Sequence, residues 1–528
     1  MNLIKKINLK KSPFPELLIF SIALIVFLYI IQPYNIAGAD CFYHAKIAKL
    51  IEKQGLIKNF PWTQFTTYKN LFVDHHFGYH LILSLFLKIP SPKTLDSASL
   101  ELEPIFKTEL ATAFLAAFFF LAFFIVSKKI KIRLPFFWTL LLLTISGFIG
   151  RLSLIRAPAL SLIIMTLATF AVIKKKHFLL LATSFIYVWF YGAWPLLFII
   201  IFIYFIAKAL FKKSLKDLFA LSNFKLLLSV VLGLGLGLVI NPYFPKTFPF
   251  YFFQTIQIAI LGTSKVAIGN EWYSPDFLQF LIYNLPVLLL WFVSITWFFI
   301  KKNKQKTLQW FLLLTSGFFF LYTLKSIRNI DYFIPFAIIF SGLMFNQIIK
   351  GFNWQKIKMD ISKLFQTNQK QVYAISTILM SCILIFFIGF SINSGIISSK
   401  KNHQESQPLN HLQAPLNWLE KNSQKGDIVY HQSWDMFPRL FYFNHKNYYI
   451  NGLDQNFFYA YDKEKYKVWE KIIKRKINPL NLNSVLKKEF KAKYVLSDKN
   501  NEKFHNLLEK SNLEKIYNSP QASIYKTK

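Results

Sequence analysis

Long apolar runs separated by short polar segments recur along most of this chain. Runs of about 17–22 apolar residues have the length that a bilayer core demands, so each predicts a transmembrane helix. We therefore expect an α-helical polytopic membrane domain over residues 1–392, with about eleven transmembrane helices. The expected helices cover residues 17–31, 110–126, 134–150, 158–173, 177–191, 194–210, 226–240, 277–300, 308–324, 332–349 and 372–392.

Lysine and arginine cluster between these apolar runs, as is typical of cytoplasmic loops. Lysines near the start of the chain therefore place the amino terminus in the cytoplasm. The apolar run 77–89 is an exception, because a span there would put the acidic segment that follows it in the cytoplasm. We expect 77–89 to lie at the membrane surface, within a first outer loop over residues 33–109. A second outer loop covers residues 241–276.

The amino terminus also resembles a secretory signal peptide. Lysines precede the first apolar run, and Ala37-Gly38-Ala39 has the small residues of a cleavage site. Because many apolar runs follow, we favour an uncleaved anchor in a multi-pass protein of the plasma (inner) membrane.

The composition changes at about residue 393, after which no apolar run is long enough to span a bilayer. The segments DIVYH, NYYING and AKYVLSD predict β-strands, while residues 415–422 and 464–475 predict helices. These features indicate an α/β domain over residues 393–528. Because the last span runs outward in this topology, the domain is expected to be extracytoplasmic.

Charge and composition limit the classes of partner that the protein can have. The net charge of +36 would indicate nucleic acid in a soluble chain, but here the basic runs lie between apolar spans and are expected to contact lipid headgroups. We therefore expect no nucleic-acid partner. The two cysteines, Cys41 and Cys382, exclude a disulfide framework. The absence of a Walker loop or dinucleotide fingerprint argues against a soluble nucleotide-sugar donor.

The first outer loop holds groups that can do chemistry. Asp40 follows the first apolar run and precedes His44, and its carboxylate can act as a general base or bind a divalent cation. The alternative is an ordinary helix cap. Asp74 and His76 can ligate a metal, or the imidazole can bind phosphate, and the alternative is a hydrated turn. Neighbours in an extended segment point to opposite sides, so only one of His75 and His76 is expected to face a site.

The second outer loop carries an acid between aromatic residues. Glu271 precedes Trp272 and Tyr273 in the segment GNEWYSP. This acid can position an acceptor or complete a cation site, with the two aromatic residues beside the substrate. The alternative is an aromatic belt that anchors the loop at the membrane surface.

Three arginines lie near the outer ends of predicted spans, where positive charge is uncommon. Arg328 is the first candidate for binding a lipid-linked phosphate, and Arg151 or Arg156 is the second. Arginine pairs bidentately with phosphate, which supports this interpretation. The alternative is a set of salt bridges to Asp331 or Glu271.

The arrangement of spans, acids and outer domain resembles the GT-C class of membrane glycosyltransferases. The matching residues are Asp40 within GADCFYHAKIA and a second acidic point at Asp74. The layout is closest to the catalytic subunits of oligosaccharyltransferases, in which a WWDYG motif reads the acceptor peptide. This chain keeps only Trp434-Asp435 of that motif. The alternative for Trp434-Asp435 is a strand-to-helix turn with a buried indole.

The resemblance and the residues together imply an enzyme. It would move a sugar or oligosaccharide from a polyprenyl-phosphate or -diphosphate carrier to an acceptor protein, lipid or glycan outside the cytoplasm. Asp40, Asp74 and Glu271 are the expected catalytic residues. The expected substrate-binding residues are His44, His76, Arg151, Arg156, Arg328, Trp272, Tyr273, Trp434 and Asp435. A divalent cation, Mg²⁺ or Mn²⁺, would use Asp40, Asp74 and His76. The alternatives are a transporter or flippase for a lipid-linked substrate and a non-catalytic membrane scaffold.

Overall fold

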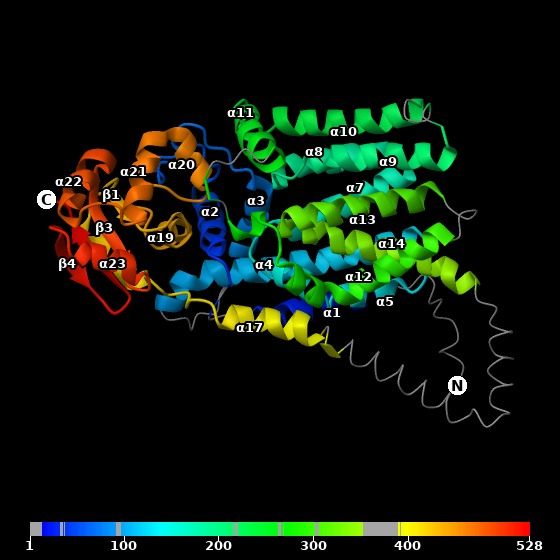
Figure 1. The fold of residues 1–528 in the computed structure, drawn as a ribbon, viewed down its shortest axis with the longest axis horizontal. Helices are drawn as coiled ribbons and strands as arrows, with labels where there is room; N and C mark the ends of the chain where they lie inside the picture. Colours follow the sequence, from blue (N-terminus) through cyan, green and yellow to red (C-terminus); the bar gives the residue numbers. More distant parts are fainter. Residues whose placement is uncertain are drawn as a thin grey trace, which may run out of the picture.

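The computed structural model describes residues 13–528 except 32–34, 36, 91–96, 215, 217–219, 262–265, 268, 301–305, 352–388 and 391. A helical bundle forms one part of the molecule, and a smaller α/β domain sits at one end of it (Figure 1). The predicted span 372–392 lies almost wholly outside the described residues. The bundle helices are α1 (Phe14–Ile30), α4 (Ser97–Lys129), α5 (Pro135–Leu142), α6 (Ser146–Leu152), α7 (Pro158–Lys174), α8 (His177–Phe190), α9 (Leu196–Lys212), α10 (Leu221–Val239), α12 (Phe277–Ile300), α13 (Thr307–Lys325) and α14 (Ile330–Gly351).

Helices occupy the apolar runs as expected, but the number of spans is not confirmed. In the described part of the chain, five helices are long and apolar enough to cross a membrane, or six if the bent pair α5–α6 counts as one span. Four others, α1, α3 (Phe77–Leu87), α7 and α8, are apolar but shorter. Their lengths lie at or below the lower limit for crossing a bilayer without help from neighbours.

Two predicted boundaries differ from the helix limits in the structure. The helix α4 begins at Ser97, inside the predicted first outer loop, and its first turns contact the C-terminal domain through Glu101, whose carbonyl accepts a 2.6 Å hydrogen bond from Tyr442. The expected single span 134–150 is instead broken into α5 and α6 by a 74° bend. Ile145 has extended backbone angles there, so the α-helical hydrogen-bond series cannot continue through it.

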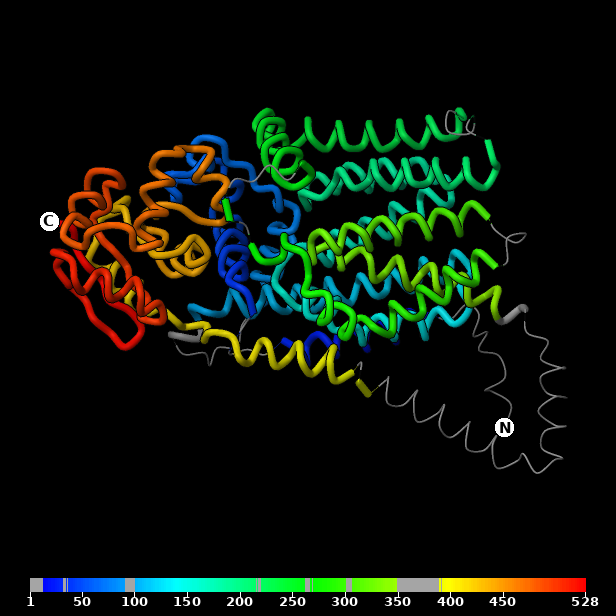
Figure 2. The backbone as a smooth tube through the Cα atoms, in the orientation of Figure 1, coloured from blue at the N-terminus to red at the C-terminus, as the bar shows by residue number. Residues whose placement is uncertain are grey.

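The described part of the first loop lies between the bundle and the C-terminal domain (Figure 2). It contains α2 (Asp40–Gln54), η1 (Thr67–Lys69) and α3, and α2 packs against both α3 and α19 of the C-terminal domain. The Lys46 ammonium donates a 2.7 Å hydrogen bond to the Tyr442 carbonyl, and the Trp62 indole donates one of 2.8 Å to the His445 carbonyl. These bonds fix the loop between the two parts.

The second loop adds short helical pieces beside this junction. They are α11 (Thr247–Tyr251), the π-helix η3 (Phe252–Ile260) and η4 (Asn270–Trp272), with η6 (Ile327–Asn329) facing η4. The Ile327 N–H donates a 3.0 Å hydrogen bond to the Tyr273 carbonyl and so ties η6 to the end of η4.

The C-terminal domain is built on a five-stranded sheet of order β2-β1-β3-β5-β4. Its first three strands are parallel, and β5 and β4 are antiparallel to their neighbours. The predicted strands and helices are confirmed, whereas β4 and β5 were not predicted individually. The strands are β1 (Ile428–His431), β2 (Tyr448–Tyr449), β3 (Ala492–Asp498), β4 (Glu514–Asn518) and β5 (Ala522–Lys526); the helices are α18 (Gln413–Asn422), η8 (Trp434–Met436), α19 (Phe437–Phe443), α20 (Gln455–Tyr461), α21 (Lys463–Ile473), α22 (Pro479–Phe490) and α23 (Glu502–Glu509).

Two helical pieces join this domain to the bundle. They are η7 (Asn393–Ile397) and α17 (Ser398–Gln404), which pack against α6 and α1. The His403 ring is 2.9 Å from the Ser153 hydroxyl and accepts a 3.2 Å hydrogen bond from the Ala37 N–H. The α/β fold itself therefore starts after α17.

Candidate active site

Glu271 in η4 lies at the centre of an ion-pair network that three arginines share. Its carboxylate is 2.8 Å from Arg156, 3.3 Å from Arg151 and 3.7 Å from Arg328. Burial raises the pKa of Glu271, but the guanidinium groups of Arg328, Arg156 and Arg151 outweigh that effect and lower it to about 2. Glu271 is therefore ionised at physiological pH, and the structure makes it a shared counter-ion rather than a proton carrier.

Two of the arginines bind a second carboxylate each. Arg156 lies 2.7 Å from Asp40, the first residue of α2, and Arg151 lies 2.8 Å from Asp331 in α14. The alternative of salt bridges to Asp331 or Glu271 therefore holds for Arg151, which pairs with both acids. It holds in part for Arg156, which pairs with Glu271 but also with Asp40. The Asp40 side chain remains 44% exposed, so a substrate can still reach it.

Arg328 is held by an aromatic ring and a hydroxyl rather than by a second carboxylate. One of its nitrogens donates a 2.9 Å hydrogen bond to the Tyr191 hydroxyl, and its guanidinium lies 4.1 Å from the centre of a Trp272 ring. Cation–π stacking of this kind fixes the plane of the guanidinium. Because its ion pair with Glu271 is the longest of the three, Arg328 keeps donors for a further anion.

Arg328 and Trp272 line a cavity of about 360 Å³. The remaining polar lining comes largely from loops and helix ends, and the apolar lining comes from α9, η3 and α13. The polar residues include His75, His76, Tyr191, Gln254, Asp331 and Asp454, and the apolar ones are Leu196, Ile199, Ile258, Ala259, Ile260 and Phe318. An amphipathic ligand matches such a lining.

A buried chain of hydrogen bonds lies behind the cavity. Asp74 is 2.7 Å from one nitrogen of His80, and the other nitrogen of His80 is 2.8 Å from His44. All three side chains are at most 4% exposed, and burial lowers the pKa of His44 well below its ordinary value. Asp74 and His44 do not line the cavity. They are positioned to support it from behind. The expected roles, substrate binding for His44 and catalysis or metal binding for Asp74, stay predictions, and the burial of Asp74 does not fit a hydrated turn.

His76 lines the cavity as expected, but so does His75. The expectation that only one of these rings faces a site assumed an extended backbone. Residues 75 and 76 instead form a turn, and the two rings lie 4.0 Å apart, centre to centre. Burial lowers the pKa of His75 to about 4 and that of His76 well below its ordinary value, so both rings are neutral at pH 7.

The residues expected to hold a metal ion are not assembled as a ligand set. Within the described ranges, no group of three or more His, Cys, Asp and Glu side chains is arranged to bind one. Asp40 is paired with Arg156, and Asp74 binds His80 and accepts from the His76 backbone N–H at 3.1 Å. Asp40, Asp74 and His76 therefore do not fit a shared cation, and a divalent cation stays a prediction.

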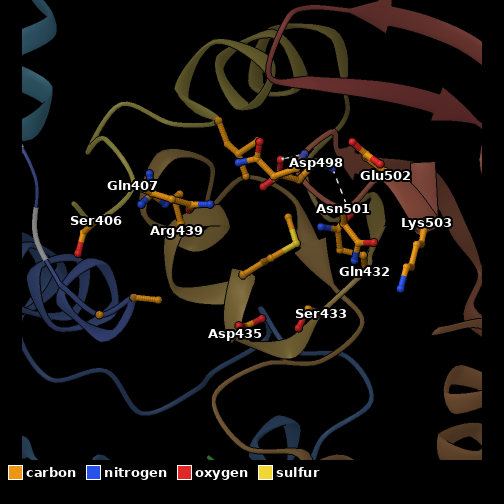
Figure 3. Close-up of a pocket in the computed structure, with 15 residues that line it drawn as sticks. Ser406, Gln407, Gln432, Ser433, Asp435, Arg439, Asp498, Asn501, Glu502 and Lys503 are labelled. Atoms are coloured by element: carbon orange, nitrogen blue, oxygen red, sulfur yellow. Dashed lines mark hydrogen bonds between the residues drawn. The ribbon is translucent and has the colours of Figure 1, made fainter. Parts of the chain in front are cut away.

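Asp435 belongs to a second site. Asp435 lines a polar cavity of about 660 Å³ with Ser433, Arg439, Asp498 and Glu502 (Figure 3), and Gly38 and Ala39 complete it from the first loop. Trp434 does not line this cavity. Its half-buried indole packs against the hydrophobic core of the C-terminal domain, which agrees only in part with the alternative of a strand-to-helix turn with a buried indole.

Sequence reasoning missed most lining residues of the first cavity, including Tyr191, His75 and Asp454. Tyr191 ends an apolar run and reads as an interfacial aromatic, His75 was set aside in favour of its neighbour, and Asp454 lies in a distant domain. Tyr273, by contrast, was expected to bind substrate but does not line either cavity.

The sequence matches no protein-family model and no curated protein. Solved structures with a similar fold do exist. The apo oligosaccharyltransferase of Archaeoglobus fulgidus superposes with a TM-score of 0.59 at 12% identity, over 98% of this chain and 75% of that one. The complex of AglB from the same organism with an inhibitory peptide and a dolichol-phosphate gives 0.62 at 12% identity, over 97% and 74%.

A shorter protein matches from end to end. ArnT from Cupriavidus metallidurans, solved with undecaprenyl phosphate, superposes with a TM-score of 0.55 at 12% identity, over 98% of each chain. This chain has the GT-C fold. The GT-C resemblance predicted from Asp40 and the span layout is thus confirmed at the level of fold. The apolar helices and these neighbours also make it a membrane protein.

Proposed function

We propose that this protein is an integral-membrane glycosyltransferase that takes a sugar or oligosaccharide from a polyprenyl-phosphate or -diphosphate carrier. The observation that carries the proposal is the amphipathic cavity that Arg328 lines. A lipid-linked phosphate has the same division between a charged head and an apolar tail.

Arg328 supplies the phosphate site in this proposal. The guanidinium is oriented by Tyr191 and Trp272 and is only loosely paired with Glu271, so its remaining donors can bind phosphate oxygens. When the bond between the sugar carbon and the phosphate oxygen breaks, negative charge grows on the leaving phosphate. A fixed guanidinium stabilises that charge in the transition state.

The apolar lining supplies the carrier site. Ile199 of α9, Ile258 of η3 and Phe318 of α13 line the cavity beside the polar groups and fit the first isoprene units of a carrier. Two proteins of the same fold were solved with such lipids, AglB with a dolichol-phosphate and ArnT with undecaprenyl phosphate.

Asp40 is our choice for the group that takes the acceptor proton. The acceptor oxygen or nitrogen attacks the sugar carbon, the carrier phosphate leaves, and the acceptor proton moves to the carboxylate. Asp40 follows Gly38 and Ala39, which line the polar cavity, and joins Arg328 through Arg156 and Glu271. This position supports the polar cavity as the acceptor side, with Asp435 among its binding groups.

A transfer assay tests the proposal. Membranes containing Arg328→Ala should transfer about a hundredfold less sugar from a polyprenyl-phosphate donor than wild type, as for loss of one fixed donor to a developing anion. Arg133→Ala is the matched control, because Arg133 is exposed and follows the far end of α4. Equal activity of wild type, Arg328→Ala and Arg133→Ala would refute the role of Arg328.

A further inference from the structure

The C-terminal domain contributes a carboxylate to the amphipathic cavity that Arg328 and Trp272 line. Asp454 is the residue from beyond α17 that lines this cavity in the described part of the chain; the others come from the bundle and its loops. It lies in the loop between β2 and α20. This loop takes no part in the ion-pair network and does not line the polar cavity.

Only one of the two oxygens of the Asp454 carboxylate forms hydrogen bonds within the described part of the protein. It caps α20, and Oδ1 accepts both the Asn456 backbone N–H at 2.8 Å and the Asn456 side-chain amide at 3.0 Å. Oδ2 makes no hydrogen bond or ion pair with any described residue. One oxygen therefore holds the helix, and the other is available to a ligand.

The position of this carboxylate is fixed by aromatic packing. Phe457, on the first turn of α20, lies 4.3 Å from Tyr68 of the first loop and is stacked at 6.1 Å on Phe250 of the second. Three segments that line or flank the cavity thus meet at α20. Rigid placement of this kind is what a recognition contact needs.

The charges of the cavity specify the ligand. Arg328 lies within electrostatic range of Asp454 and is suited to an anion, whereas a half-buried carboxylate that lines the cavity, with no cation bound to it among the described residues, is suited to hydrogen-bond donors. A bare lipid phosphate would satisfy only the arginine. A phosphate that carries a sugar would satisfy both groups.

We infer that Asp454 recognises the donor sugar, by accepting a hydrogen bond from a hydroxyl or amino group of the sugar on the carrier phosphate. This inference rests on the proposed function and adds a specificity-determining residue to it. It also gives the C-terminal domain a part in donor binding, separate from the polar cavity.

Asp454→Asn isolates the contact. Asparagine caps helices as well as aspartate does, so its oxygen can keep the bonds to Asn456, while an amide donor replaces Oδ2. Asp462→Asn is the matched control, because Asp462 caps α21 in the same domain, accepts from the Lys465 N–H at 2.9 Å and does not line the cavity.

Binding to the purified full-length protein in nanodiscs gives the test. The probes are undecaprenyl phosphate and its glucosyl, mannosyl and glucosaminyl forms. Asp454→Asn should bind undecaprenyl phosphate as wild type does but bind at least one glycosylated form about tenfold more weakly, as for loss of one charged hydrogen bond. Asp462→Asn should match wild type with every probe. A loss confined to the glucosaminyl form identifies an amino group, and a loss that includes neutral hexoses identifies a hydroxyl.

Other results overturn the inference. If wild type does not discriminate between bare and glycosylated carriers, or if Asp454→Asn loses affinity for all probes equally, the sugar contact is excluded and the proposed function still stands. If wild type binds none of the probes, the proposed function fails together with the inference.

Discussion

The guanidinium of Arg328 lies over Trp272, 4.1 Å from the centre of a ring, while the Tyr191 hydroxyl accepts a hydrogen bond from one of its N–H groups at 2.9 Å. These contacts orient the charge toward the cavity without neutralising it. Arg151 and Arg156, in contrast, each bind two carboxylates. Among the three arginines of the network, Arg328 is therefore the one available to a substrate.

Replacing Arg328 by lysine should separate charge from geometry. Lysine keeps the positive charge but loses the planar fork and the stacking on Trp272. We expect Arg328→Lys to transfer sugar at a rate between those of wild type and Arg328→Ala. Rates from a radiolabelled lipid-linked donor measure this, and a lysine variant no better than alanine would show that the fork is essential.

Asp40→Asn should reduce transfer by about a hundredfold or more, because it removes the proposed base. It also removes the ion pair with Arg156, so stability must be followed in parallel. Arg156→Gln removes that pair while leaving the carboxylate. If Asp40 acts only through the pair, the two variants will lose activity equally, which would contradict its role as base.

The Glu271 network should make stability depend on pH in the acid range. The pKa of Glu271 is lowered to about 2 in the folded protein, so its contribution is fully present above its ordinary value and is lost as the pH falls toward 2. The melting temperature in detergent should therefore fall more steeply between pH 4.5 and pH 3 for wild type than for Glu271→Gln. Parallel curves for the two proteins would contradict the ion-pair assignment.

Removing His80 should destabilise the fold more than removing a surface histidine. Asp74 is 3% exposed and would keep an uncompensated buried charge, which costs about 3–5 kcal/mol. His505→Ala is the control, because its partner Glu509 is partly exposed and such pairs contribute about 0–1 kcal/mol. Thermal melts of both variants measure the difference, and equal melting temperatures would exclude a structural role for the buried chain.

Local patterns predicted the helices well, because burial in a bilayer is encoded in each apolar run separately. The run 277–300 coincides with α12, and DIVYH and AKYVLSD contain β1 and β3. The bend at Ile145 had only a weak signal, the Ser146-Gly147 pair that follows it, and the length of the apolar run does not take such a pair into account. Length alone could not settle how many helices cross the membrane.

The site depended on contacts that no local pattern contains. Asp331 is 180 residues from Arg151, and Asp454 reaches the cavity from another domain. Residue type was enough to single out Arg328 and Glu271, because unpaired charges near a membrane need partners. It could not tell which charge would be satisfied within the protein and which would face a substrate.

A structure determined with undecaprenyl phosphate tests the central claim most directly. We predict that the phosphate lies within hydrogen-bond distance of the Arg328 guanidinium, with the isoprenoid chain along α9, η3 and α13. A phosphate bound away from Arg328, with the cavity left to other groups, would contradict the account.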